Sequence, residues 1–124
     1  MIYFQISTPT ELVSIKSSDI MCIEADGNYS TIQLSYGWRH TVTRQIGEIS
    51  EWFHEHEEPG FIRLGRSLIV NINYICIINL TNKSLTLQGK GADHLVVVTA
   101  PRNALEVLKE KIEQQRGLNT FRQR

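Results

Sequence analysis

The sequence predicts one mainly β domain with two helices. Turn residues such as Asp26-Gly27-Asn28 separate short runs rich in β-branched and aromatic residues, which is the pattern of β-hairpins. Apolar residues recur at helical spacing in two segments, one in the middle of the chain and one near its end. A length of 124 residues allows one hydrophobic core and is too short for two ordinary domains. We therefore expect about eight short strands together with the two helices.

Four strand-like segments precede the middle helix. They show apolar and polar alternation or runs of β-branched and aromatic residues, and they span residues 11–16, 20–25, 29–34 and 38–43. The turn at Asp26-Gly27-Asn28 joins the second segment to the third, so the tip of this predicted hairpin runs from Asp26 to Ser30. A second turn, at Tyr36-Gly37, leads into the fourth segment.

The middle helix is predicted by apolar residues three and four positions apart. Its buried face consists of Ile46, Ile49, Trp52 and Phe53. Thr43 or Arg44 opens the helix, which ends before Pro59-Gly60. Its solvated face carries the glutamates Glu48, Glu51, Glu55, Glu57 and Glu58. This acidic face would repel DNA, so the helix is not expected to bind it.

The histidines and cysteines do not form a metal-binding pattern. His54 and His56 are two positions apart on a helix, so their side chains point to nearly opposite sides and cannot share an ion. Cys22 and Cys76 lie in apolar runs without a histidine at ligand spacing, which predicts two buried, reduced thiols. We expect no metal and no cofactor. A small hydrolase or nuclease is the least favoured function, because the four histidines are scattered through separate elements.

The stretch from Phe61 to Tyr74 is the centre of the sequence. Ile62 and Leu64 share one face of a first strand, and Gly65-Arg66-Ser67 forms a hinge. The second strand has a row of apolar residues on one face, namely Leu68, Val70, Ile72 and Tyr74. No acidic residue in the stretch neutralises the two arginines. Two interpretations are open: a solvated hairpin corner, or a tip that presents Arg66 and Ser67 to a ligand.

Three further strands and the second helix follow. The strands span residues 75–80, 84–88 and 95–99, and a turn at residues 81–83 joins the first two. Residues 89–93 form a loop without the features of a phosphate-binding motif. A helix begins at Ala100-Pro101-Arg102-Asn103 and buries Leu105, Leu108 and Ile112. Residues 116–124 lack apolar periodicity and are predicted to be a frayed basic tail.

The charge distribution indicates a polyanion as a partner. Residues 1–58 hold three basic and nine acidic residues, whereas residues 59–124 hold ten basic and four acidic ones. The second half is therefore a candidate surface for a polyanion. Neither helix has the composition of a recognition helix, so loops must make any contact with nucleic acid. The chain has no membrane-spanning run and no signal peptide, which predicts a cytoplasmic location without membrane contact.

Four segments together resemble the LytTR-type DNA-binding domain, the output domain of many bacterial response regulators in two-component systems. They are residues 19–29, the middle helix, residues 61–71 and Arg102 at a strand-to-helix junction. The most specific match is the pattern Phe-x-Arg-x-x-x-Ser-x-Ile-Val-Asn, which is met by Phe61, Arg63, Ser67, Ile69, Val70 and Asn71. The resemblance covers roughly residues 11–113.

This resemblance implies an elongated stack of small antiparallel β-sheets that contacts successive major grooves of DNA through loops. The first loop corresponds to Asn28, Tyr29, Ser30 and Thr31, the second to Arg63, Arg66 and Ser67, and the third contact to Arg102. The chemistry of Arg66 suits a forked pair of hydrogen bonds to guanine, while Arg63, Ser67 and Arg102 suit phosphate oxygens. Tyr29 is either a contact or a core residue, and Asn71 is expected to bond to a neighbouring backbone.

Two positions depart from the family pattern. Pro101 replaces a small hydroxyl residue before Arg102, which affects helix capping, and the first loop has no basic residue. The predicted organisation is an N-terminal arm at residues 1–10, the DNA-binding domain at 11–115 and a basic tail at 116–124. No receiver domain fits upstream, so the chain is a regulator controlled by a partner protein or a piece of a longer protein.

The predicted function is sequence-specific binding of double-stranded DNA by a transcriptional regulator without catalytic activity. Members of the family often occupy direct repeats, so two copies are expected to bind side by side on DNA and to associate weakly without it. The alternative is a protein-interaction module that retains the fold without the DNA function and uses the acidic helix face. Mutating Arg66 and Arg102 would leave the partner binding of such a module intact.

Overall fold

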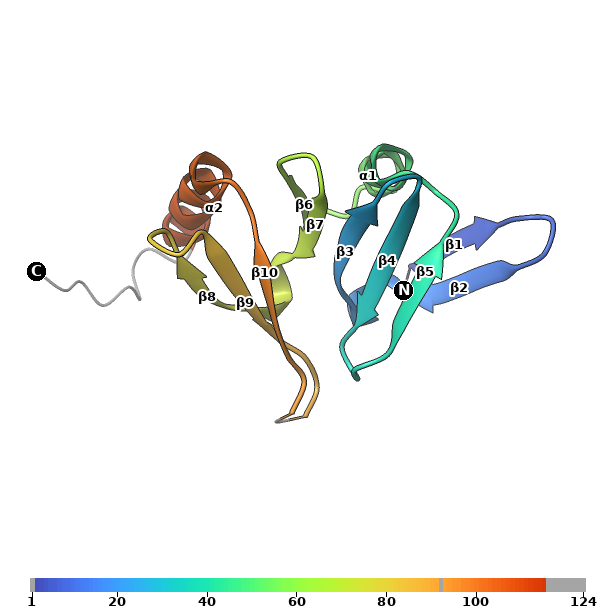
Figure 1. Ribbon diagram of the computed structural model, residues 1–124, viewed down its shortest axis with the longest axis horizontal. Coiled ribbons are helices and arrows are strands. Elements are labelled where there is room, and N and C mark those ends of the chain that lie inside the picture. Colours follow the sequence, from blue (N-terminus) through green and yellow to red (C-terminus); the bar gives the residue numbers. More distant parts are fainter. Residues whose placement is uncertain (1, 92, 116–124) are drawn as a thin grey trace, which may run out of the picture.

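Ten strands and two α-helices form three antiparallel sheets in the computed structural model, which describes residues 2–91 and 93–115 (Figure 1). One sheet pairs β1 (Tyr3–Ser7) with β2 (Leu12–Lys16). A five-stranded sheet has the order β5-β4-β3-β7-β6 and comprises β3 (Ile20–Asp26), β4 (Tyr29–Leu34), β5 (Arg39–Val42), β6 (Phe61–Leu64) and β7 (Leu68–Asn71). A three-stranded sheet has the order β10-β9-β8 and comprises β8 (Ile75–Asn79), β9 (Ser84–Gln88) and β10 (Leu95–Thr99).

The sheets follow one another along the long axis of the molecule, with α1 (Ile46–Glu55) beside the five-stranded sheet and α2 (Arg102–Gln115) beside the three-stranded one (Figure 1). The prediction of a mainly β fold built from small antiparallel sheets with two helices is therefore confirmed. The predicted basic tail, residues 116–124, lies outside the described residues.

The five-stranded sheet is covered on both faces, because strand alternation sends neighbouring residues to opposite sides. On one side, Ile23, Ile32 and Ile69 pack with α1 and the β1–β2 sheet. On the other side, Leu68 and Val70 pack with α2 and the β8–β10 sheet. All four residues of β7 are buried for this reason. The near-continuous apolar sequences of β3 and β7 follow from this two-sided burial.

Strand β1 was not predicted within the N-terminal arm. It pairs with β2 from Tyr3↔Lys16 to Ser7↔Leu12, and Phe4 is fully buried in the core beside α1. Buried and exposed residues alternate along β1 over only five residues, which is too short a pattern to predict a strand by itself. Its pairing with β2 is what makes this segment a strand. Residues 3–7 are therefore part of the packed structure.

The predicted burial of Cys76 is wrong. Both cysteines are free, but only Cys22 is buried and Cys76 is exposed. The pairing of β8 with β9 shifts between Ile75 and Ile77, so Cys76 occupies an irregularity in the ladder and does not follow the simple alternation. Burial raises the pKa of the Cys22 thiol to about 12, and this cysteine therefore stays protonated and unreactive at neutral pH.

Two element boundaries also differ from the prediction. The second strand of the central stretch ends at Asn71, and Ile72–Tyr74 form a single 3₁₀ turn whose Asn73 N–H donates to Asn71 Oδ1. The Asn71 amide also donates to the carbonyl of Ile20, so its expected backbone bonding is confirmed. Helix α1 begins at Ile46, later than Thr43 or Arg44, because Thr43 and Arg44 lie in a bend and the capping residue Gln45 has an extended backbone.

Candidate nucleic-acid interface

Three loops lie along one edge of the elongated molecule, at the top in Figure 1. They are the β3–β4 turn, the β6–β7 turn and the junction between β10 and α2. The sequence predicted a site at each of these places. Because the loops belong to sheets arranged along the long axis, they form a row.

The first loop exposes Asn28 and Tyr29. Gly27 at its tip has a φ of +62°, a backbone conformation that favours glycine. Tyr29 is 50% exposed, so the core alternative for this residue is excluded. The Asn28 side-chain carbonyl accepts a hydrogen bond from Gln45 Nε2 at 3.2 Å, which links the loop to the start of α1.

Ser30 supports the first loop from beneath and is not part of its surface. It is fully buried, and its hydroxyl donates to the carbonyl of Arg44 at 2.7 Å. Alternation in β4 explains this position, because Ser30 shares a face with the core residues Ile32 and Leu34. Thr31 is on the opposite face, half-buried, with its hydroxyl 3.0 Å from that of Thr41 on β5.

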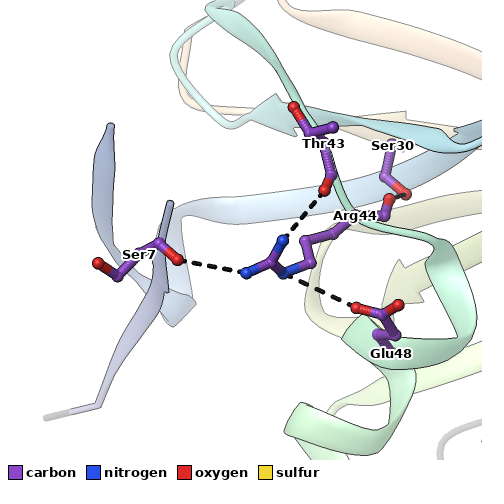
Figure 2. Close-up of polar contacts among 5 residues, drawn as sticks. All are labelled: Ser7, Ser30, Thr43, Arg44 and Glu48. Atoms are coloured by element: carbon purple, nitrogen blue, oxygen red, sulfur yellow. Dashed lines mark hydrogen bonds and ion pairs between the residues drawn. The ribbon is translucent and has the colours of Figure 1, made fainter. Parts of the chain in front are cut away.

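Arg44 is a structural residue of this loop that the sequence interpretation missed. Figure 2 shows its guanidinium between β1, α1 and the segment that joins β5 to α1: Nη2 donates to Ser7 O, Nη1 donates to Thr43 O, and Nε lies 3.7 Å from Glu48 Oε2. With the Ser30 bond to its carbonyl, Arg44 joins β1, β4 and α1. The signal in the sequence was an arginine four positions before a glutamate at a helix start.

The second loop presents Arg66 and Ser67 at its tip. Gly65 has a φ of +67°, and Ala25 N–H donates to Ser67 O at 2.9 Å, which fixes the β6–β7 turn to the end of β3. Arg66 and Ser67 are exposed. Arg63 is exposed on β6, and its Nη2 donates to Arg66 O at 3.3 Å, so this arginine braces the loop.

The third loop brings Arg102 to the first residue of α2. The Arg102 Nε donates to Glu106 Oε1 at 2.9 Å, and Nη1 lies 3.5 Å from the carbonyl of Leu80. Pro101 precedes the helix and lies against Gly65, where an added Cβ would be 3.1 Å from the proline ring. The third loop therefore touches the second, while the first loop is held to the second through Ala25 and Ser67.

The rest of the described structure offers no metal site or membrane-spanning helix. No group of three or more histidine, cysteine, aspartate or glutamate residues among residues 2–91 and 93–115 is arranged to hold an ion. No helix in the same part of the chain is long and apolar enough to cross a membrane. Four of the five predicted glutamates on and after α1 are exposed, and Glu58 accepts a hydrogen bond from the Ser17 hydroxyl at 3.0 Å.

Comparison with known proteins identifies the fold and the family. The structure is similar to the LytTr DNA-binding domain of a proposed methyl-accepting/DNA response regulator from Bacillus cereus, with a TM-score of 0.65 and 20% sequence identity. The match covers 89% of this chain and 95% of that one. No curated protein matches the sequence significantly. The family model of the LytTr DNA-binding domain matches residues 10–113. Because that match spans most of the sequence, the chain belongs to the LytTr DNA-binding domain family.

Proposed function

We propose that this protein is a sequence-specific regulator of transcription whose three loops contact double-stranded DNA in successive major grooves. The observation that supports this most is the row of loops along one edge, in which the β6–β7 turn, with the exposed Arg66, is the middle loop. Arg66 makes no ion pair with another described residue, so its five N–H donors are available to a ligand.

In this proposal the loops have different roles. Arg66 contacts a guanine edge, because a guanidinium matches the O6 and N7 acceptors of that base. Ser67, Arg63 and Arg102 contact phosphate oxygens, which position the protein without specifying sequence. Asn28, Tyr29 and Thr31 form the first contact surface. Ser30 has no exposed surface and is therefore not a contact residue; its hydrogen bond to the Arg44 carbonyl holds that loop in place.

Regulation is part of the same proposal. Two copies bind side by side on direct repeats and associate weakly when DNA is absent. A partner protein, or a receiver domain of a response regulator in a longer protein, supplies the signal. DNA binding places the protein in the bacterial cytoplasm, and the proposal includes no catalytic activity.

Selection of bound sequences from random duplex DNA tests the proposal, with wild-type protein and Arg66→Ala compared at one stated salt concentration. Wild type should enrich a repeated motif. The substitution should relax one or two guanine positions, since a forked pair contributes about 1–3 kcal/mol of discrimination.

Arg39→Ala is the matched control, because Arg39 is exposed and pairs with Gln33 at the end of β5 remote from the first loop. This variant should retain the wild-type motif. Absence of any enrichment at low salt would refute the DNA-binding function and favour the protein-interaction module.

A further inference from the structure

The turn between β8 and β9 is attached to the third loop. The carbonyl of Lys83 accepts a hydrogen bond from Ala100 N–H at 3.2 Å, and Arg102 Nη1 lies 3.5 Å from the carbonyl of Leu80. Lys83 has a φ of +53°, and Asn82 N–H donates to Asn79 Oδ1 at 3.0 Å. The backbone of this turn is therefore held in one position relative to the start of α2.

A groove of about 920 Å³ separates this turn from the second loop. Its lining includes Arg66 and Ser67 from the second loop, Asn82 and Lys83 from the β8–β9 turn, and Pro101 and Asn103 from the start of α2. All six residues are exposed. The groove thus joins the second and third contacts into one surface.

The charges around this groove favour an anion. Its lining contains two cations, Arg66 and Lys83, and no acidic residue. Within the described part of the chain, neither cation forms an ion pair, whereas Lys90 pairs with Asp19 at 2.8 Å and Lys109 with Glu113 at 2.9 Å. Two unpaired cations with the amide donors of Asn82 and Asn103 suit a phosphodiester, which carries one negative charge and accepts hydrogen bonds.

We propose that Asn82 and Lys83 form a fourth DNA contact, in which the groove holds the sugar-phosphate backbone between the second and third loops. This inference rests on the proposed function. Lys83 Nζ binds one phosphate, and the Asn82 amide donates to the same backbone. Because phosphates carry no sequence information directly, this contact raises affinity without changing the preferred motif.

Lys83→Asn tests the contact. Asparagine removes the charge and tolerates a positive φ, so the turn should keep its conformation. Affinity for the enriched site and for a scrambled duplex is measured over a range of salt concentrations. We expect a loss of about fivefold for both duplexes and a slope of log affinity against log salt that is smaller by about 0.9.

Two further variants control for indirect effects. Lys83→Arg keeps the charge and should keep the wild-type slope. Lys90→Asn removes a lysine from the β9–β10 loop at the opposite edge of the molecule (Figure 1) and should leave the slope unchanged.

Two results would overturn the inference while leaving the proposed function in place. One is a Lys83→Asn protein with wild-type slope and affinity, and the other is a loss of affinity for the enriched site alone without a change of slope. Failure of wild-type protein to select any DNA would overturn both proposals.

Discussion

Replacing Phe4 with alanine is expected to lower the free energy of unfolding by about 3–5 kcal/mol. The Phe4 ring is fully buried, stacks on Phe53 with centroids 5.2 Å apart and meets Trp52 edge-on at 4.9 Å. Truncation removes these contacts and leaves a cavity between β1 and α1. Urea denaturation of the wild-type and variant proteins measures the difference.

Tyr3→Ala is the control for Phe4. Tyr3 precedes Phe4 on the same strand but is 46% exposed, so its truncation should cost less than about 1 kcal/mol. Equal losses for the two variants would contradict the placement of β1 in the core. The comparison also tests whether residues before the family match at residue 10 contribute to stability.

Replacing Gly89 with alanine is expected to cost about 3 kcal/mol, at the upper end of the usual range for overpacking. A Cβ at this position would lie 2.1 Å from the carbonyl oxygen of Ser35 and 3.1 Å from Met21 Sδ. The backbone must shift to relieve the first of these contacts. Since Lys90 N–H donates to Ser35 O at 2.6 Å, this shift separates the β8–β10 sheet from the five-stranded sheet.

Gly47→Ala is the control for Gly89. Gly47 lies in α1, and a Cβ there would be 3.8 Å from the nearest atom, which is ordinary contact. Alanine should be neutral or stabilising by up to about 1 kcal/mol, because it favours a helix more than glycine does. A Gly89→Ala protein as stable as this control would contradict the close packing of the two sheets.

The order of the elements could be predicted because the turn chemistry is local. Asp26-Gly27-Asn28 and Gly65-Arg66-Ser67 both form turns between strands, and each glycine has a positive φ. The hydrogen bonding of the Asn71 side chain to backbone could also be predicted, because strand alternation places it on the opposite face from Leu68 and Val70. These predictions needed only residues close together in the sequence.

The remaining features depend on contacts between distant residues. Ser30 shares a strand face with Ile32 and Leu34, but its hydrogen-bond partner, the Arg44 carbonyl, is 14 positions away and is identified only by the fold. The exposure of Cys76 depends on an irregular register between β8 and β9. The position of Lys83 beside Ala100 depends on the hydrogen bond that joins the β8–β9 turn to the segment between β10 and α2. Such pairings have no periodic signature in the sequence.

Replacing the guanines of the enriched site with 7-deazaguanine, one at a time, tests most directly whether Arg66 contacts a base. The modified base lacks the N7 acceptor in the major groove, so it removes one of the two hydrogen bonds that a guanidinium forms with guanine. We predict one guanine at which wild-type affinity falls by about fivefold or more and at which Arg66→Ala shows no further loss. Equal losses for both proteins at every guanine, or no loss for wild type, would contradict the assignment of Arg66 to base recognition.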